Sequence, residues 1–298
     1  MEFVEKQSIK LSGHQTFPFR YGWLEKGISF LQAGNSFQQE DAFVELGVGK
    51  NMAESIKYWL EMAGLIDLSD GSLTELSNKL LGKNGWDPFL EDDASLWIIH
   101  WEIATNPRFF SSGTALFSLV HKPEFSKIEV LDAIKRFLLQ EEKKLPSESV
   151  LKRDVDCYLR AYASLSQNKK GEESFSCPLQ DLGLIHPMLG TDMFRFSIGP
   201  KPTLSPEIIC FSIWDYLSNN RRRTTMRLQE ALYQTSSPGQ VFKLDENTIV
   251  DAITTIQTHP VFGSRFAFTE TSGIAMIQCT MENGFELLNQ YYCQGGLS

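Results

Sequence analysis

The residues best suited to chemistry gather in an N-terminal segment, residues 12–24, which is rich in His, Gln, Arg and aromatic side chains. His14 is of a type that acts as a general base or metal ligand near neutral pH, and Arg20 is of a type that holds phosphate. Pro18 keeps the middle of the segment extended. The same composition also fits an arm whose aromatic rings attach it to the helices that follow. His14 and Arg20 are the candidate catalytic residues, and this structural alternative stays open.

The sequence lacks the familiar patterns of several enzyme classes. It contains no HExxH, P-loop, GxGxxG or GxSxG motif, and no recognisable PD…ExK or GIY-YIG nuclease run. Nucleases commonly hold metal ions with clustered carboxylates, but Asp92 and Asp93 stand where a helix begins and are explained by capping. His100 and Glu102 lie in an apolar helix expected at 94–104, where a core histidine with a carboxylate at its rim is the simpler interpretation.

Basic side chains suited to DNA occur in two places. The most basic stretch follows a helix expected at 206–218, and adjacent arginines beside Asn and Thr suit contacts to DNA phosphates. A solvated loop that balances nearby acids is the alternative. The second place is the polar face of an amphipathic helix near residue 150. The residues assigned to DNA in these two places are Arg221, Arg222, Arg223, Lys152 and Arg153.

Residues 41–80 have the order helix, tight turn, helix and hairpin, which is that of a winged helix-turn-helix unit. The glycines of 47–49 break the first helix, and the second helix carries an apolar stripe from Met52 to Ala63. Asp70-Gly71 between two short apolar runs predicts the hairpin. The alternative is a unit that only packs or dimerises. The polar face of the second helix is expected to contact a DNA groove through Lys50, Asn51, Ser55, Lys57 and Tyr58.

Two further units follow along the chain. Residues 126–162 predict two amphipathic helices without an obvious wing. Residues 224–234 predict a helix, followed by a turn, a helix capped by Asp245 and a hairpin. The fold class is therefore mainly α with small β-hairpin wings, built from repeated winged helix-turn-helix units. The expected domains are an N-terminal winged helix-turn-helix domain at 1–105, a middle helical domain at 106–200 and a C-terminal winged-helix-like domain at 201–298.

Composition limits these interpretations. The 298 residues carry a net charge of -9, so DNA binding has to come from local basic patches. Hydrophobic residues make up 42% of the chain, which predicts a folded protein with a sizeable core. The five cysteines form no CxxC pair, which argues against structural zinc. With no apolar leader and no membrane-length run, the sequence predicts a soluble, cytoplasmic protein.

Several runs resemble the SspB-type DNA nickase family of bacterial DNA phosphorothioation operons, which was long catalogued as a domain of unknown function. The resemblance is strongest over SGHQTFPFRYGWL (12–24), DAFVELGVGKNM (41–52) and WLEMAGLI (59–66), and weaker pieces extend to residue 244. It implies an endonuclease that opens one DNA strand, so that partner proteins replace a phosphate oxygen with sulfur during antiviral defence. It implies Mg or Mn as the cofactor. The implied partners are a cysteine desulfurase, an ATPase and a phosphoadenosine-phosphosulfate-reductase-like protein.

Three functions stay open on the sequence. The first is a metal-dependent, single-strand DNA endonuclease that works with the sulfur-transfer proteins. The second is a non-enzymatic winged-helix adaptor that places those proteins on DNA, an alternative motivated by the missing carboxylate cluster. The third is a regulator of its own operon, in which Asn51 pairs with adenine. A homodimer is compatible with all three, because winged units often pair.

Overall fold

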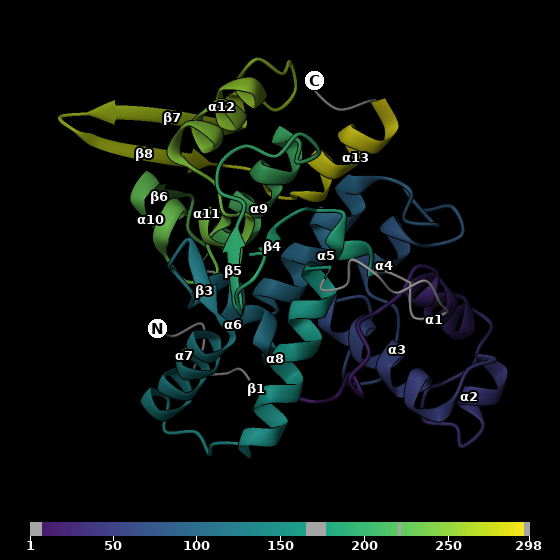
Figure 1. Ribbon diagram of the computed structural model, residues 1–298. Helices are drawn as coiled ribbons and strands as arrows, with labels where there is room; N and C mark the ends of the chain where they lie inside the picture. Colours follow the sequence, from purple (N-terminus) through teal and green to yellow (C-terminus); the bar gives the residue numbers. More distant parts are fainter. Residues whose placement is uncertain (1–7, 165–176, 220–221, 295–298) are drawn as a thin grey trace.

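A computed structural model describes residues 8–164, 177–219 and 222–294 (Figure 1). The expectation of a mainly helical chain with small sheets is confirmed. The helices are α1 (Trp23–Gln32), α2 (Ala42–Glu45), α3 (Lys50–Met62), α4 (Glu75–Leu80), α5 (Asp93–Thr105), α6 (Ser112–Ser118), α7 (Lys127–Gln140), α8 (Glu148–Tyr162), α9 (Pro206–Asn219), α10 (Leu228–Tyr233), α11 (Pro238–Phe242), α12 (Glu246–Gln257) and α13 (Phe285–Gln294). The strands are β1 (Ser8–Ile9), β2 (Phe109–Phe110), β3 (Glu124–Ser126), β4 (Ile185–Pro187), β5 (Met193–Phe196), β6 (Thr225–Arg227), β7 (Phe266–Thr271) and β8 (Ile274–Cys279).

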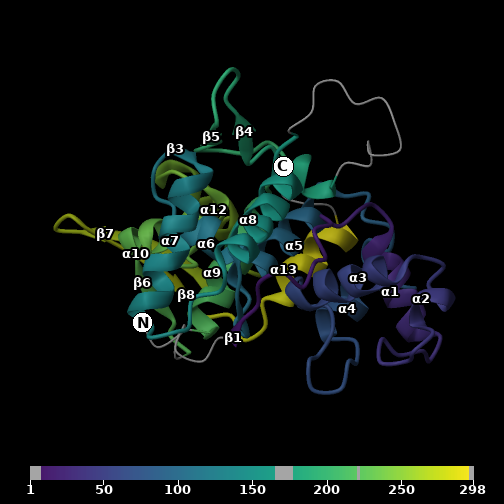
Figure 2. The same cartoon turned by 60° about the horizontal axis from the view of Figure 1, so that its bottom comes forward.

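The described strands form three small sheets. β1 runs parallel to β2, which attaches the N-terminal arm to the segment before α6. The other two sheets are antiparallel and share one arrangement, in which the last strand in sequence lies between the other two: β3-β5-β4 and β6-β8-β7. The β7–β8 hairpin projects from the body in Figure 1, and the β4–β5 hairpin projects in Figure 2.

Helix α5 lies at the centre of the molecule and is buried on nearly all sides, as its apolar sequence predicts. Asp92 caps it by accepting the N–H of Ala94 at 2.8 Å. It belongs to the first expected domain and packs against α6 of the second and against α9 and α11 of the third. The buried apolar side chains of these elements belong to one continuous core. The division into three domains stays a prediction.

Two expected elements differ from the structure. The hairpin expected at 65–76 is reduced to a single bridge between Ile66 and Leu73. Its second strand is cut short because the Thr74 side chain accepts the N–H of Ser77 and starts α4 there. The helix expected at 224–234 begins only at Leu228, because residues 225–227 pair with β8 as a strand.

The middle segment holds a sheet that the sequence analysis missed. Strand β3 pairs with β5, and β5 pairs with β4, although the helices α7 and α8 separate β3 from the other two. The expected start of α7 is confirmed: Ser126 and Glu129 form a reciprocal capping box. In the described part of the chain, no helix has the length and apolar character needed to cross a membrane.

Candidate functional site

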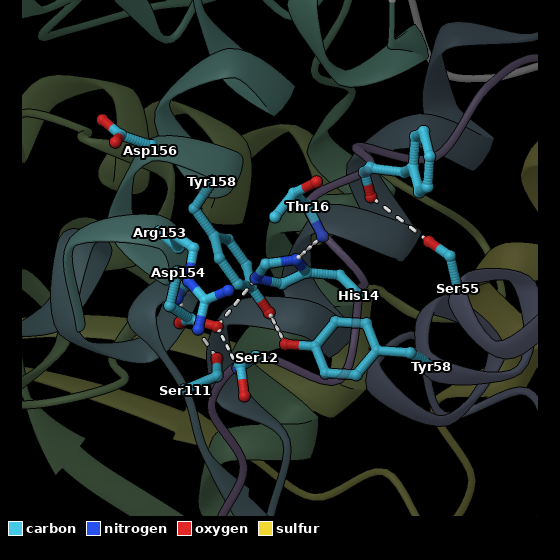
Figure 3. Close-up of polar contacts among 12 residues, drawn as sticks. Ser12, His14, Thr16, Ser55, Tyr58, Ser111, Arg153, Asp154, Asp156 and Tyr158 are labelled. Atoms are coloured by element: carbon cyan, nitrogen blue, oxygen red, sulfur yellow. Dashed lines mark hydrogen bonds and ion pairs between the residues drawn. The ribbon is translucent and has the colours of Figure 1, made fainter. Parts of the chain in front are cut away.

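His14 lies at the centre of a buried polar cluster that joins the N-terminal arm to α8 (Figure 3). Its Nδ1 accepts the backbone N–H of Thr16 at 2.9 Å, and its Nε2 lies 2.8 Å from Oδ1 of Asp154. The same carboxylate oxygen accepts the N–H of Ser12 at 2.6 Å. Because Nδ1 accepts, the hydrogen of the neutral ring is on Nε2, which donates to Asp154.

Two tyrosines enclose this His14 cluster. The hydroxyls of Tyr58 and Tyr158 lie 2.9 Å apart, and both rings pack edge-on against the imidazole. Burial raises the pKa of both phenols well above its usual value, so both stay neutral. A Cβ on Gly13 would lie 2.4 Å from Cδ2 of Tyr58, so the arm approaches α3 as closely as glycine allows.

The cluster is closed to solvent. The side chains of His14 and Asp154 are 1% and 0% exposed, so a DNA phosphate does not reach them in this conformation. Oδ2 of Asp154 is buried and, among the described residues, lacks a hydrogen-bond partner. The geometry supports attachment of the arm as the role of His14, and its catalytic role stays a prediction.

Arg20, the second candidate catalytic residue, precedes α1 and is partly exposed. Its guanidinium carbon lies 5.5 Å from the centre of the Trp23 ring, a cation–π contact. Unlike His14, it keeps part of its surface in solvent. A contact between Arg20 and a phosphate stays a prediction.

His100 has the surroundings of a core histidine. It is fully buried, with Nδ1 2.8 Å from the hydroxyl of Tyr162 and Nε2 3.0 Å from the carbonyl oxygen of Val241. Burial lowers its pKa to about 3, and the positive charge of Lys243 also lowers it. The neutral ring links α5, α8 and α11, which matches the structural interpretation of this residue.

The basic end of α3 is open to solvent. Lys50 and Asn51 are exposed at its start, where side chains of a helix can enter a DNA groove. Lys57 is 42% exposed, and its Nζ lies 4.0 Å from Glu61 one turn later. These three residues keep the placement expected for DNA contact.

Ser55 and Tyr58 do not lie on the open face of α3, so their expected placement is wrong. Ser55 is buried and its hydroxyl donates to the carbonyl oxygen of Phe17 at 3.3 Å. Tyr58 is 2% exposed and belongs to the His14 cluster. The N-terminal arm covers this side of α3, which helical periodicity alone does not reveal.

The basic pair of α8 is exposed as expected. Nζ of Lys152 lies 2.7 Å from Glu148 one turn earlier, and Nε of Arg153 donates to the carbonyl oxygen of Ser149 at 3.3 Å. Such surface contacts stabilise little. Both cations therefore can exchange them for phosphate oxygens.

The arginine stretch lies between α9 and β6. Arg221 lies outside the described residues. Arg222 and Arg223 are exposed. Two hydrogen bonds, of 2.7 and 2.8 Å, join Arg223 to the Glu230 carboxylate, and the hydrogen bond to Glu230 raises the pKa of the guanidinium. Glu230 already balances the charge of Arg223, so Arg222 offers the more available cation of the two.

A pair of carboxylates that the sequence analysis did not connect lies between α5 and α9. Burial raises the pKa of Glu102 to about 8, and the negative charge of Asp215 raises it further. Burial also raises the pKa of Asp215 to about 6, although hydrogen bonds from Trp101 and Asn219 act in the opposite direction. Nε1 of Trp101 donates to Oδ2 of Asp215 at 2.9 Å and fixes its orientation.

A weak signal for the carboxylate pair exists in the sequence. Glu102 and Asp215 each interrupt an otherwise apolar helical run. Such acids are rarely buried without a partner. Nothing in the pattern shows that α5 packs against α9, as it does in the structure.

The carboxylate pair is the candidate for holding a divalent cation. Among the described residues no group of three or more His, Cys, Asp or Glu side chains is placed to hold a metal ion. Mg²⁺, however, is often bound through one or two carboxylates, with water completing its coordination. Glu102 and Asp215 supply hard oxygen donors and keep part of their surface exposed. A divalent charge would also offset the repulsion between them.

Comparisons with known proteins identify the family. No curated protein matches the chain. A crystal structure of SspB shares 27% identity with a TM-score of 0.86, covering 98% of this chain and 90% of that one. A magnesium ion-bound SspB crystal structure shares 26% identity with the same TM-score, covering 97% and 90%. The resemblance to SspB-type proteins is thereby confirmed. The model of the family described as "Protein of unknown function (DUF4007)" matches residues 11–292, and the chain belongs to this family.

Proposed function

We propose that the protein is a single-strand DNA endonuclease, a nickase, that acts in DNA phosphorothioate modification and phage defence. The observation that carries this proposal is the likeness of 97% of the chain to a magnesium ion-bound SspB. Phosphodiester hydrolysis commonly uses one or two divalent ions, so a magnesium-binding relative supports metal-dependent cleavage. The resemblance of residues 12–24 to a family expected to nick DNA supports the same activity.

The two three-stranded sheets support DNA binding. In each sheet the third strand lies between the first and the second, and helices lie between the first and second strands in sequence. We infer from this arrangement that each sheet belongs to a winged helix-turn-helix unit. The projecting hairpins β4–β5 and β7–β8 take the place of the wings. The proposed phosphate contacts are the exposed or partly exposed side chains Lys50, Asn51, Lys57, Lys152, Arg153, Arg222 and Arg223, together with Arg221.

Glu102 and Asp215 would hold the divalent ion in this proposal. When bound, Mg²⁺ or Mn²⁺ activates water as a nucleophile and offsets negative charge on the phosphate. Trp101 keeps Asp215 in one orientation through its N–H. Gly64 leaves room for Glu102, because a Cβ there would lie 2.7 Å from its Oε2.

The test is relaxation of supercoiled plasmid with Mg²⁺ or Mn²⁺, together with DNA binding measured separately. Glu102→Gln and Asp215→Asn are expected to lower nicking by about 100-fold or more and to leave DNA affinity and melting temperature nearly unchanged. Asp132→Asn, an exposed acid on α7, is the matched control and keeps full activity. Wild type that never nicks, where a known nuclease does, overturns the proposal. Variants that nick like wild type place the cleavage centre elsewhere.

A non-enzymatic adaptor is the second candidate. It is favoured by the burial of His14 and by the lack, among the described residues, of a group of three metal-binding side chains. Its role would be to place the cysteine desulfurase, the ATPase and the phosphoadenosine-phosphosulfate-reductase-like protein on DNA. Salt-sensitive DNA binding without nicking, with either metal, supports it. A strong preference for the protein's own promoter would instead indicate an operon regulator that uses the exposed Asn51.

A further inference from the structure

A cavity of about 660 Å³ lies where the start of α5 meets α13. Its walls combine two kinds of side chain. The acidic part consists of Asp87, Glu91, Asp92 and Asp93, and the aromatic part includes Trp86, Tyr291 and Tyr292. The volume is that of a typical ligand site and exceeds the space that one hydrated metal ion needs.

Part of the acidic wall is structural. The Asp87 carboxylate accepts the N–H groups of Glu91 and Asp92, at 2.9 and 3.0 Å, and the hydroxyl of Ser95. Asp92 caps α5 and accepts the hydroxyl of Tyr291 at 3.1 Å. These bonds hold two carboxylates in place at the edge of the cavity.

The donors that hold Asp87 and Asp92 in place are neutral backbone and hydroxyl groups. Within the described segments, none of the four carboxylates of the acidic wall forms an ion pair with a lysine or arginine. Burial raises the pKa of Asp93, and the charges of Asp92 and Asp181 raise it further. A cation that entered the cavity would therefore gain from all of these charges.

The aromatic wall is rigid. Trp86 and Tyr292 stack nearly parallel, at 8°, with ring centres 5.3 Å apart. The Trp86 N–H donates to Asn289 at 3.3 Å, and the hydroxyl of Tyr292 lies 2.8 Å from that of Ser95. The Lys79 ammonium lies 5.9 Å from the Trp86 ring centre, so this ring already attracts one cation of the chain.

We propose that the cavity binds the cationic side chains of a basic segment on a partner protein. Carboxylates beside fixed aromatic rings are the surroundings that favour lysine and arginine. The same charge repels phosphate, so this face is turned toward protein and away from the DNA backbone. The inference does not depend on nicking, because neither Glu102 nor Asp215 lines the cavity.

The test is a calorimetric titration of the full chain with the peptide acetyl-Gly-Arg-Lys-Arg-Gly-amide at low salt. The control peptide replaces arginine by citrulline and lysine by norleucine, so it keeps the shape and loses the charge. The double variant Glu91→Gln/Asp93→Asn is compared with Asp192→Asn, an exposed acid on the β4–β5 turn. We expect the double variant to bind the basic peptide at least about 10-fold more weakly than wild type and Asp192→Asn.

Equal binding of both peptides, or equal affinity of the double variant and wild type, would overturn the proposal. So would an absence of binding at about 1 mM peptide, since a useful docking site reaches at least this affinity. Spermidine and MgCl₂ are titrated in parallel. Tighter binding of either one than of the peptide assigns the cavity to a free cation and refutes the partner segment. Plasmid nicking is measured on the same double variant, where it is expected to persist, so the two proposals fail separately.

Discussion

Replacing His14 by alanine removes the centre of the cluster that attaches the N-terminal arm to α8. The ring donates to Asp154 at 2.8 Å and accepts from Thr16 at 2.9 Å, and it is enclosed by aromatic rings. After the substitution, Oδ1 of Asp154 retains only the N–H of Ser12, and a buried carboxylate loses its main partner. Breaking a buried pair in this way costs about 3–5 kcal/mol.

The free energy of unfolding is expected to fall by about 4 kcal/mol. This figure combines the loss of the buried partner with part of the further loss that comes from the cavity left by the ring. Unfolding entropy is about 2.1 cal/mol/K per residue, so 298 residues give about 0.6 kcal/mol/K. The melting temperature should therefore fall by about 6 °C. Asp154→Asn should lose less, since an amide still accepts from His14 and Ser12.

Calorimetric melting of wild type, both single variants and the double variant His14→Ala/Asp154→Asn measures this coupling. The double variant should be destabilised by less than the sum of the singles, by about 1–3 kcal/mol. The same proteins are assayed for plasmid nicking at a temperature where all are folded. A melting temperature within about 1 °C of wild type, with nicking abolished, would refute the structural reasoning and make His14 a catalytic residue.

Three further outcomes are expected. His100→Gln keeps a polar side chain that does not titrate. Because folding lowers the pKa of His100 from 6.5 to about 3, wild type should lose stability relative to the variant as pH falls below 6.5. If the difference in urea midpoint between wild type and variant is the same at pH 7 and at pH 5, this reasoning is wrong. Gly13→Ala places a Cβ 2.4 Å from Tyr58 and should lower the free energy of unfolding, measured in urea, by about 1–3 kcal/mol. The control Gly49→Ala, whose Cβ would have no atom within 4 Å, should lower it by well under half of that. Lys50→Ala should reduce the slope of log affinity for DNA against log salt by about 1, measured by fluorescence anisotropy, and an unchanged slope removes Lys50 from the interface.

The elements that the sequence predicted well are those with strong local signals. The apolar stripe of α3 and the capping box of α7 lie within single segments, so their residues alone determine them. The β7–β8 hairpin is also local, because its strands are joined by Thr271-Ser272-Gly273 at the expected turn. These are the features for which neighbouring residues carry the information.

The missed elements depend on distant partners. The alternation over residues 194–199 does predict a strand, which is β5, but its partners β3 and β4 have three residues each and show no alternation of their own. His14 meets a partner 140 positions away, and Ser55 is covered by an arm whose path its own helix does not encode. Helical periodicity correctly separated the apolar stripe of α3 from its other side chains. It could not distinguish exposed residues such as Lys50 from Ser55 and Tyr58, whose hydroxyls form internal hydrogen bonds.

The attachment of the N-terminal arm has a consequence for biosynthesis. Residues 8–14 leave the ribosome before their partners, because β1 needs β2, about 100 residues later, and His14 needs Asp154, 140 residues later. At a synthesis rate of about 5–20 residues per second, the arm waits on the order of 10 s for its last partner. During that interval the arm can pack only on nearer partners, such as Trp23, which contacts Phe17, and Trp59, which contacts Phe19. Closure of the His14 cluster therefore marks a late step in the folding of this protein, after α8 has emerged.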